Sequence, residues 1–388
     1  MNNFFQNNLQ KSLFLGFVLL TSQTFAQDSA MKFTSIMSDF QSGVARIEKD
    51  NKVGFVDQKG NEVVSTIYEN AYDMSEGLAA IEKDGKWGFV DKNGNIKIDF
   101  QFEEVQNFSQ SMAAVKFEGK WGFIDKKGEF KIKSQYEDAL SFSEGLVFVK
   151  HFGKWGVVDI KNKVIAEPKF DKAESFVEGY ACVAIAGKYG FIDKKGTVVI
   201  PMKYKSAKSF VEGLAAVKTE NNKWGFIDNL DVMTIDAKYD EVDNFTEGIA
   251  VARIRNKREI IDKTGKPIID TKYDFIESSS EGMLVVCNKN KFGIIDKTGK
   301  EITEVKYDNI LSFSEGYARI SMNGKYGFVD KTGAEIIPLI YDEAFNFSEG
   351  MARISIFNKN GFISKKGREI FIQNQPYSKG ELTKVDKN

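Results

Sequence analysis

Several residue types that carry chemistry are scarce in this chain of 388 residues. It has one histidine, two cysteines and five prolines. A single histidine excludes histidine-rich metal sites and most nucleophiles activated by histidine. Two cysteines exclude a small scaffold stapled by disulfides. Lys and Arg number 54 against 55 Asp and Glu, so the formal net charge of −1 indicates neither a nucleic-acid binder nor a polybasic membrane binder.

What the chain does contain is enough apolar sequence for a substantial core. Apolar residues make up 42% and charged residues 28%, which is too apolar for a disordered protein. No segment approaches the roughly 18 consecutive apolar residues of a transmembrane helix. Cys182 and Cys287 lie three repeats apart, so we expect two free and mostly buried thiols.

The first 26 residues have the order of a secretory signal peptide. Lys11 precedes the short apolar run 12–20, and Thr24-Phe25-Ala26 forms a small-x-small cleavage pattern before Gln27. Because Gln27 is not a cysteine, we do not expect a lipid anchor. The prediction is an exported protein, periplasmic or secreted, with a signal peptide at 1–26 and a short linker at 27–39.

The rest of the chain is a tandem repeat. The pattern Lys-aromatic-Gly-apolar-apolar-Asp occurs ten times, three of them as weaker copies, at a period of 34 residues with a single step of 35. Two further columns keep this period, Phe-x-Glu-Gly and an aromatic residue followed by Asp or Glu. The prediction is one continuous domain of ten repeats at 40–375, followed by a polar tail at 376–388. The repeat positions that we expect to be structural are Trp87, Gly88, Asp91, Trp121, Gly122, Asp125, Trp155, Gly156, Asp159, Tyr189, Gly190, Asp193, Trp224, Gly225, Asp228, Tyr326, Gly327 and Asp330.

Each unit is predicted to be a three-stranded antiparallel meander. In the copy at 77–108, Asp84-Gly85 predicts a hairpin between strands 78–81 and 86–91, and 91–94 predicts a turn before strand 96–100. The glycine in the second strand allows a neighbouring backbone to come close. From Phe102 the apolar spacing changes to three, which indicates a tight helical turn.

These residues resemble a known family. Trp-Gly followed by Phe-Ile-Asp, the turn closed by Gly, the Tyr-Asp pair and Phe-Ser-Glu-Gly are similar to the WG, or KWG, repeats of bacterial proteins. The resemblance covers residues 40–372, with departures at Val53, Arg258-Glu259, Phe292 and Asn360 and at Ser111. It implies a repeat fold, and it implies no enzyme activity or cofactor.

Two all-β architectures fit such units. We expect an open superhelical stack, because the terminal copies lack the aromatic residue and so resemble caps, with Val53 in the first and Asn360 in the last. The alternative is a closed ring of the β-propeller type, which usually has four-stranded blades.

The repeated polar and aromatic columns have plain structural explanations. Most Asp residues of the repeat precede a lysine, so turn capping is favoured over a Ca²⁺ ladder. The Trp slot also accepts Tyr and Phe, so core packing is favoured over sugar stacking. A Glu that recurs in every unit more often has a structural role in each unit than a catalytic role in a single carboxylate pair. We therefore predict no catalytic, cofactor-binding or metal-binding residues.

Units six to eight break the pattern at several positions. The candidate partner patch there comprises Asn229, Arg258, Glu259 and Ser279, although simple degeneration of the repeat explains it too. The predicted function is that of an exported, non-enzymatic scaffold for protein–protein interaction at the cell envelope or outside the cell, with a protein or an extended polymer as partner. The alternative is a module that binds carbohydrate or cell wall through the repeat aromatics.

Overall fold

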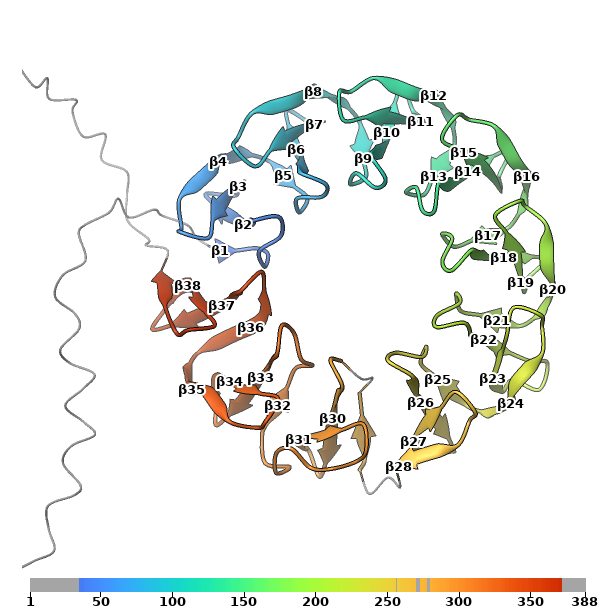
Figure 1. The fold of residues 1–388 in the computed structure, drawn as a ribbon. Coiled ribbons are helices and arrows are strands. Elements are labelled where there is room, and N and C mark those ends of the chain that lie inside the picture. Colours follow the sequence, from blue (N-terminus) through green and yellow to red (C-terminus); the bar gives the residue numbers. More distant parts are fainter. Residues whose placement is uncertain (1–34, 256, 270–272, 278–279, 372–388) are drawn as a thin grey trace, which may run out of the picture.

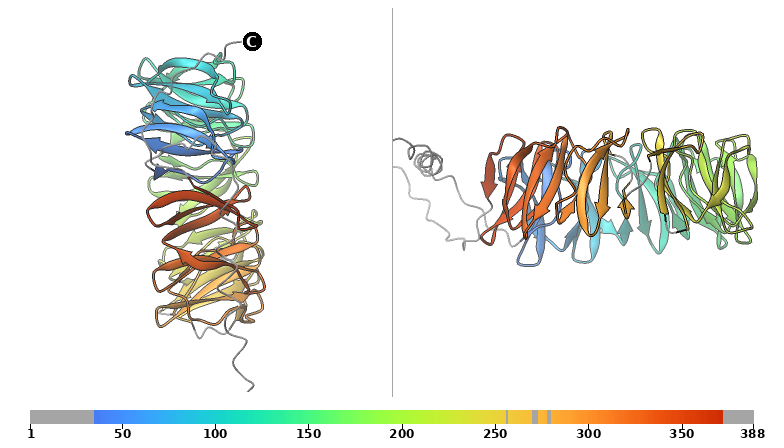
Figure 2. Two further views of the ribbon diagram at one scale, coloured as in Figure 1. Left: turned by 90° about the vertical axis from the view of Figure 1, so that its left-hand side faces the viewer. Right: turned by 90° about the horizontal axis from the view of Figure 1, so that it is seen from below.

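The repeats form a closed ring of ten β-sheets. The computed structural model describes residues 35–255, 257–269, 273–277 and 280–371, and the signal peptide and polar tail predicted above lie outside them. The described residues make ten antiparallel sheets, arranged as blades around a centre (Figure 1). From the side the ring is a thin disc (Figure 2). No helix in the described part of the chain has the length and apolar character to span a bilayer.

Each blade is a meander that runs outward from the centre of the ring. The innermost strands are β1 (Ser35–Ile36), β5 (Asn70–Ala71), β9 (Glu104–Val105), β13 (Asp138–Ala139), β17 (Lys172–Ala173), β21 (Ser206–Ala207), β25 (Glu241–Val242), β29 (Phe275–Ile276), β32 (Asn309–Ile310) and β36 (Glu343–Ser348). The second strands are β2 (Val44–Lys49), β6 (Leu78–Lys83), β10 (Met112–Phe117), β14 (Leu146–His151), β18 (Tyr180–Ile185), β22 (Ala215–Lys218), β26 (Ile249–Ile254), β30 (Met283–Asn288), β33 (Tyr317–Met322) and β37 (Met351–Ile356).

The outer half of each blade follows the same order. The third strands are β3 (Lys52–Asp57), β7 (Lys86–Asp91), β11 (Lys120–Asp125), β15 (Lys154–Asp159), β19 (Lys188–Asp193), β23 (Trp224–Ile227), β27 (Lys257–Asp262), β31 (Lys291–Asp296), β34 (Lys325–Asp330) and β38 (Lys359–Ser364). The outermost strands are β4 (Glu62–Tyr68), β8 (Ile96–Phe102), β12 (Phe130–Tyr136), β16 (Val164–Phe170), β20 (Val198–Tyr204), β24 (Met233–Tyr239), β28 (Pro267–Ile269), β35 (Glu335–Tyr341) and β39 (Glu369–Phe371). We number the blades 1 to 10 along the chain.

Because each blade is a meander, successive connections between its strands lie on opposite faces of the disc. The hairpins between second and third strands and the links from one blade to the next lie on one face, called here the hairpin face. The loops between innermost and second strands, which carry Phe-x-Glu-Gly, lie on the opposite face. They share that face with the turns after the repeated Asp, and we call it the turn face.

The predicted three-stranded unit is wrong by one strand. The segment expected to be a helical turn contains the innermost strand of the next blade, β9, and no helix occurs among the described residues. The spacing of three arises because Phe102, Val105 and Phe108 enter one core from an outer strand, an inner strand and a loop. Residues 35–39, which the repeat count places in a linker, belong to blade 1.

The prediction of an open stack is also wrong, because blade 10 packs against blade 1. The Phe40 and Phe362 rings meet with centroids 4.5 Å apart, inside a buried cluster that also holds Ile47 and Met351. Val53, taken above as the mark of a cap, is only 4% exposed and packs in the core between blades 1 and 2. A terminal blade without its aromatic residue therefore still buries both faces.

Packing between blades repeats around the ring. The Phe of a Phe-x-Glu-Gly segment packs against the preceding blade, as Phe142 does with Phe123 of the third strand at a centroid distance of 4.9 Å. Phe108 makes the same contact with Phe89. Within a blade, the outer strand bulges over the glycine of the third strand. A Cβ at Gly122 would lie 2.6 Å from the carbonyl oxygen of Ile132, so this position requires glycine.

Blades 7 and 8 depart from this regularity at their outer edges. In blade 7, Glu259 occupies the glycine position, and the described part of the outer strand is β28, Pro267–Ile269. Blade 8 has a three-stranded sheet, and its outer segment makes only isolated bridges at Ile295–Glu301 and Phe292–Tyr307.

Candidate functional site

The Asp residues that end the third strands cap the turns that follow. Asp125 Oδ1 accepts hydrogen bonds from the amides of Lys127 at 2.9 Å and Glu129 at 3.0 Å. Hydrogen bonds from the Asn95 side chain and from turn amides lower the pKa of the equivalent Asp91. Within the described ranges, no group of three His, Cys, Asp or Glu residues could hold a metal ion. The carboxylate oxygens of this column therefore already bind the protein's own backbone.

The Glu column joins neighbouring blades on the turn face. Each of these carboxylates accepts hydrogen bonds from main-chain amides of the next blade. The Glu178 oxygens, for example, accept from the amides of Glu212 at 2.6 Å and Gly213 at 2.8 Å. We call this set the carboxylate ladder and each contact a rung. Its members are Glu76, Glu144, Glu178, Glu212, Glu247, Glu281, Glu315 and Glu349, with Gln110 supplying an amide oxygen in their place at one rung.

Lysines strengthen most rungs of the ladder. Lys126 Nζ lies 3.1 Å from a Glu76 oxygen and donates to the Glu76 carbonyl at 2.9 Å. Partial burial alone would raise the pKa of Glu76, but the hydrogen bonds from Lys126 and the Ser111 amide outweigh it and lower the pKa. The glutamates of the ladder thus act as fasteners between neighbouring blades.

The aromatic column lies between blades with graded burial. Trp87 and Trp121 are each 7% exposed and belong to buried clusters. Trp155, Tyr189 and Trp224, on blades 4 to 6, are half-buried, and lysine ammonium groups lie 5.7–5.9 Å from their ring centroids. The single histidine, His151, lies beside the exposed ring of Phe152 at a hairpin tip.

The structure does not bring the predicted patch of units six to eight together. Asn229 lies on the turn face of blade 6, where its side chain donates to the Tyr180 hydroxyl. Arg258 is the second residue of the third strand of blade 7, near the hairpin face, and its guanidinium lies 4.3 Å from the Phe275 ring centroid. Glu259 follows it in the glycine position, and Ser279 lies outside the described residues.

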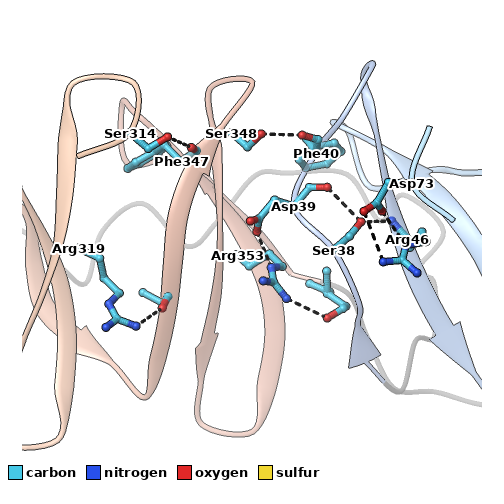
Figure 3. Close-up of polar contacts among 12 residues, drawn as sticks. Ser38, Asp39, Phe40, Arg46, Asp73, Ser314, Arg319, Phe347, Ser348 and Arg353 are labelled. Carbon is cyan, nitrogen blue, oxygen red and sulfur yellow. Dashed lines mark hydrogen bonds and ion pairs between the residues drawn. The ribbon is translucent and has the colours of Figure 1, made fainter. Parts of the chain in front are cut away.

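A different place in the ring collects residues that break the repeat, and sequence reasoning missed it. A cavity of about 540 Å³ opens where blade 10 meets blades 1 and 2, lined by Ser38, Asp39, Arg46, Asp73 and Arg353 among others. Figure 3 shows both arginines engaged with acids across blade boundaries. Arg353 Nε lies 2.6 Å from Asp39, and Arg46 Nε lies 2.6 Å from Asp73.

These arginines belong to a row on three consecutive blades. Arg319, Arg353 and Arg46 occupy one position in the second strands of blades 9, 10 and 1. Each reaches a main-chain carbonyl of the next blade's innermost strand (Figure 3). The other seven blades have Ala, Phe, Cys or Val there. The Nε of Arg319, in blade 9, is buried without a partner among the described residues. The side-chain oxygen of Asn346, in blade 10, is buried without a partner there as well.

The cavity therefore presents charged donors and acceptors, and its walls suit a polar ligand. A cavity of this size fits a small molecule or a short peptide segment. The string Ala-Arg-Ile occurs at this position in the first copy and the last two copies, at 45–47, 318–320 and 352–354. This shared string is the sequence signal of the site, and it is hidden among the columns that recur in most units because it occurs in only three of them.

Comparison with known proteins agrees with the tandem repeat. The family model described as WG containing repeat matches nine consecutive segments: 54–87, 87–121, 121–155, 155–189, 189–224, 224–257, 260–292, 292–326 and 326–359. The chain belongs to the WG repeat family. Each WG match runs from the third strand of one blade to the third strand of the next, so nine matches and two half-blades make ten blades.

Similarity to solved structures supports the fold alone. A crystal structure of the eukaryotic initiation factor aligns with a TM-score of 0.52 at 12% identity, covering 86% of this WG repeat chain and 96% of that chain. The computationally designed Ika8 protein aligns with a TM-score of 0.39 at 13% identity, covering 71% and 98%. BamB from Moraxella catarrhalis aligns with a TM-score of 0.34 at 12% identity, covering 77% and 94%. No curated protein matches the chain by sequence.

Both buried thiols are unpaired, as expected. Cys182 and Cys287 are free, and burial raises the pKa of Cys182 to about 12. A thiol with so high a pKa stays protonated and is a poor nucleophile.

Proposed function

We propose that this WG repeat ring is an exported, non-enzymatic scaffold that binds a protein partner at the cell envelope or outside the cell. One observation carries the proposal. The polar side chains that recur in most blades fasten the ring, whereas the arginine row and the polar cavity gather where the ring closes. A binding site on a repeat protein is expected where such departures cluster on a rigid frame.

The position of the partner is tested by site-specific photo-crosslinking in cells that produce the full chain. A photo-reactive amino acid replaces Gln41, an exposed residue that lines the cavity, or Leu230, which is 78% exposed on the same face five blades away. We expect a discrete adduct with one protein from the Gln41 position and none from Leu230. Equal adducts from both positions, or none from either in folded protein, would contradict the proposal.

A second candidate function has one observation in its favour. Trp155, Tyr189 and Trp224 form a run of half-buried aromatic side chains on consecutive blades, and aromatic faces bind sugar rings. A glycan and peptidoglycan panel, screened with and without Ca²⁺, tests it. A specific ligand whose binding is lost in Trp224→Ala but kept in Trp87→Phe would replace the protein scaffold by a carbohydrate-binding module.

Export is a separate part of the proposal. The signal peptide at 1–26 supports it, and the chain recovered from the producing cells is expected to begin at Gln27. Mass spectrometry of the intact protein measures this directly, and a chain that retains Met1 would overturn the predicted export.

A further inference from the structure

The occupied rungs of the carboxylate ladder bind their carboxylates with the same backbone geometry. At the interface between blades 10 and 1, the amides of Ser42 and Gly43 donate to the two oxygens of Glu349, both at 2.6 Å. The backbone that presents these amides has φ values of 57° and 83°. The amides of Glu212 and Gly213 hold Glu178 in the same way, and these two residues have φ values of 53° and 83°. Successive amides in this conformation form a concave cradle for an anion.

The interface between blades 1 and 2 has the same cradle without its carboxylate. Glu76 and Gly77 present their amides there with φ values of 50° and 86°, as in the occupied rungs. The residue of blade 1 that should supply the acid is Ser42, whose side chain is shorter than glutamate by two bonds. Within the described part of the chain, the Gly77 amide makes no hydrogen bond.

The lysine that completes a rung is also present. At six rungs a lysine from the next blade lies 3.0–3.7 Å from the carboxylate. At the rung where the acceptor is the neutral Gln110, the lysine position holds Ile160. At the interface of blades 1 and 2 the position holds Lys92, which is exposed and has no partner among the described residues. The positive charge is thus kept where the chain supplies no acid for it.

We propose that the amides of Glu76 and Gly77 and the ammonium of Lys92 form a binding site for a carboxylate supplied by a protein partner. Two main-chain donors and one lysine make charge-assisted hydrogen bonds of the kind that fix an acidic group in place. The site borders the cavity at the ring closure, because Gln41 and Asp73 line that cavity and lie one and three residues from Ser42 and Glu76. This inference rests on the proposed function and adds the chemistry of the partner.

Amide NMR on the full chain labelled with ¹⁵N tests the site directly, with propionate as the probe because it reproduces the end of a glutamate side chain. We expect a saturable shift of the Gly77 amide and no shift at Gly43, whose cradle Glu349 occupies. Shifts that do not saturate, or that are the same at Gly43, would overturn the proposal.

Variants around the cradle provide matched controls. Ser42→Glu is expected to fill the site from within the chain and abolish the propionate shift, whereas Ser42→Ala leaves it intact. Lys92→Gln is expected to weaken binding at least threefold, and Lys331→Gln, at the occupied Glu281 rung, to leave it unchanged. Wild-type binding by Ser42→Glu, or equal losses from both lysine variants, would contradict a carboxylate site at this interface.

Two peptides of equal length distinguish a side-chain carboxylate from a chain-terminal one as the group that binds. One has an internal glutamate and an amidated end, and the other has a free terminal carboxylate and no acidic side chain. If neither peptide nor propionate binds at Gly77 while the Gln41 crosslink persists, this inference fails and the scaffold function stands. If they bind but no adduct forms in cells, the site stands and the scaffold function fails.

Discussion

The two interfaces of blade 1 differ in how they are held. The interface with blade 10 joins two ends of the chain through the Phe40–Phe362 contact and the Glu349 rung. It also has a hydrogen bond from Ser348 to the Phe40 carbonyl and the Arg353–Asp39 ion pair (Figure 3). The interface with blade 2 is covalently continuous and lacks its rung. Chain continuity makes a rung dispensable, whereas a closure without a shared strand depends on all of its side-chain contacts.

The largest effect is expected from removing the aromatic contact at the closure. Phe362→Ala deletes a buried ring and should cost about 3–5 kcal/mol of unfolding free energy. Phe89→Ala, at the equivalent contact between blades 2 and 3, should cost a similar amount. Only Phe362→Ala is expected to open the ring, measured as a larger radius of gyration in small-angle scattering. Equal expansion of both variants would show that the closure is no more vulnerable than an internal interface.

The next effect is a loss of stability in acid. The pKa values of Glu76, Glu212 and Glu315 are below their usual value because hydrogen bonds from lysines and amides outweigh partial burial. Their contribution is therefore complete above the ordinary pKa of about 4.5 and is lost as pH falls through the lower folded values. Chemical unfolding measured from pH 6 to pH 3 should show this decline.

A triple variant isolates the ladder in that experiment. Replacing the three glutamates by glutamine keeps an acceptor, as Gln110 does in the native ring with a bond of 2.7 Å from the Gly145 amide. The stability of this variant should vary less with pH than that of the wild type. A decline as steep as that of the wild type would place the acid sensitivity elsewhere.

A smaller effect is expected from the arginine pairs on either side of blade 1. Arg353→Met and Arg46→Met should each cost about 1–2 kcal/mol, because each leaves a partly exposed Asp without its partner. Urea unfolding measures both. If their costs differ by much more than this range, the two pairs are not equivalent and the arginine row is not a simple repeat of one contact.

The smallest effect is a gain at the interface of blades 1 and 2. Ser42→Glu adds the missing rung and should stabilise the ring by about 0.5–1 kcal/mol, as expected for a surface pair with amide hydrogen bonds. The urea midpoint should rise relative to Ser42→Gln. A midpoint that falls would mean that the cradle at Gly77 cannot accept the longer side chain.

Much of the blade could be predicted from sequence and one strand could not. The hairpin at Asp84-Gly85 and the strand at Lys86–Asp91 follow from local turn residues and alternating apolar side chains. The innermost strand has two residues in most blades, too short for any alternation to appear. Its neighbours Phe102 and Phe108 enter the same core, so their spacing imitated a helical turn.

The candidate site was less predictable, because it depends on residues from both ends of the chain. Nothing near Ser42 indicates that its amide will bind Glu349, more than three hundred residues later. Glu349, the ladder carboxylate of blade 10, could have signalled closure, since in an open stack it would face no following blade. That reading requires knowing that the Glu column bonds between blades, which is a tertiary fact.

The sequence by itself determined the family, the number of repeats and most strands, since these depend on periodic side chains and on turns a few residues long. Only the tertiary structure decided that the array closes, that residues 35–39 belong to the first blade, and that the arginine row meets a cavity beside an unfilled carboxylate cradle. The reason is geometric. A small rotation from blade to blade is invisible in any one repeat, and only its sum over ten blades brings the two ends together.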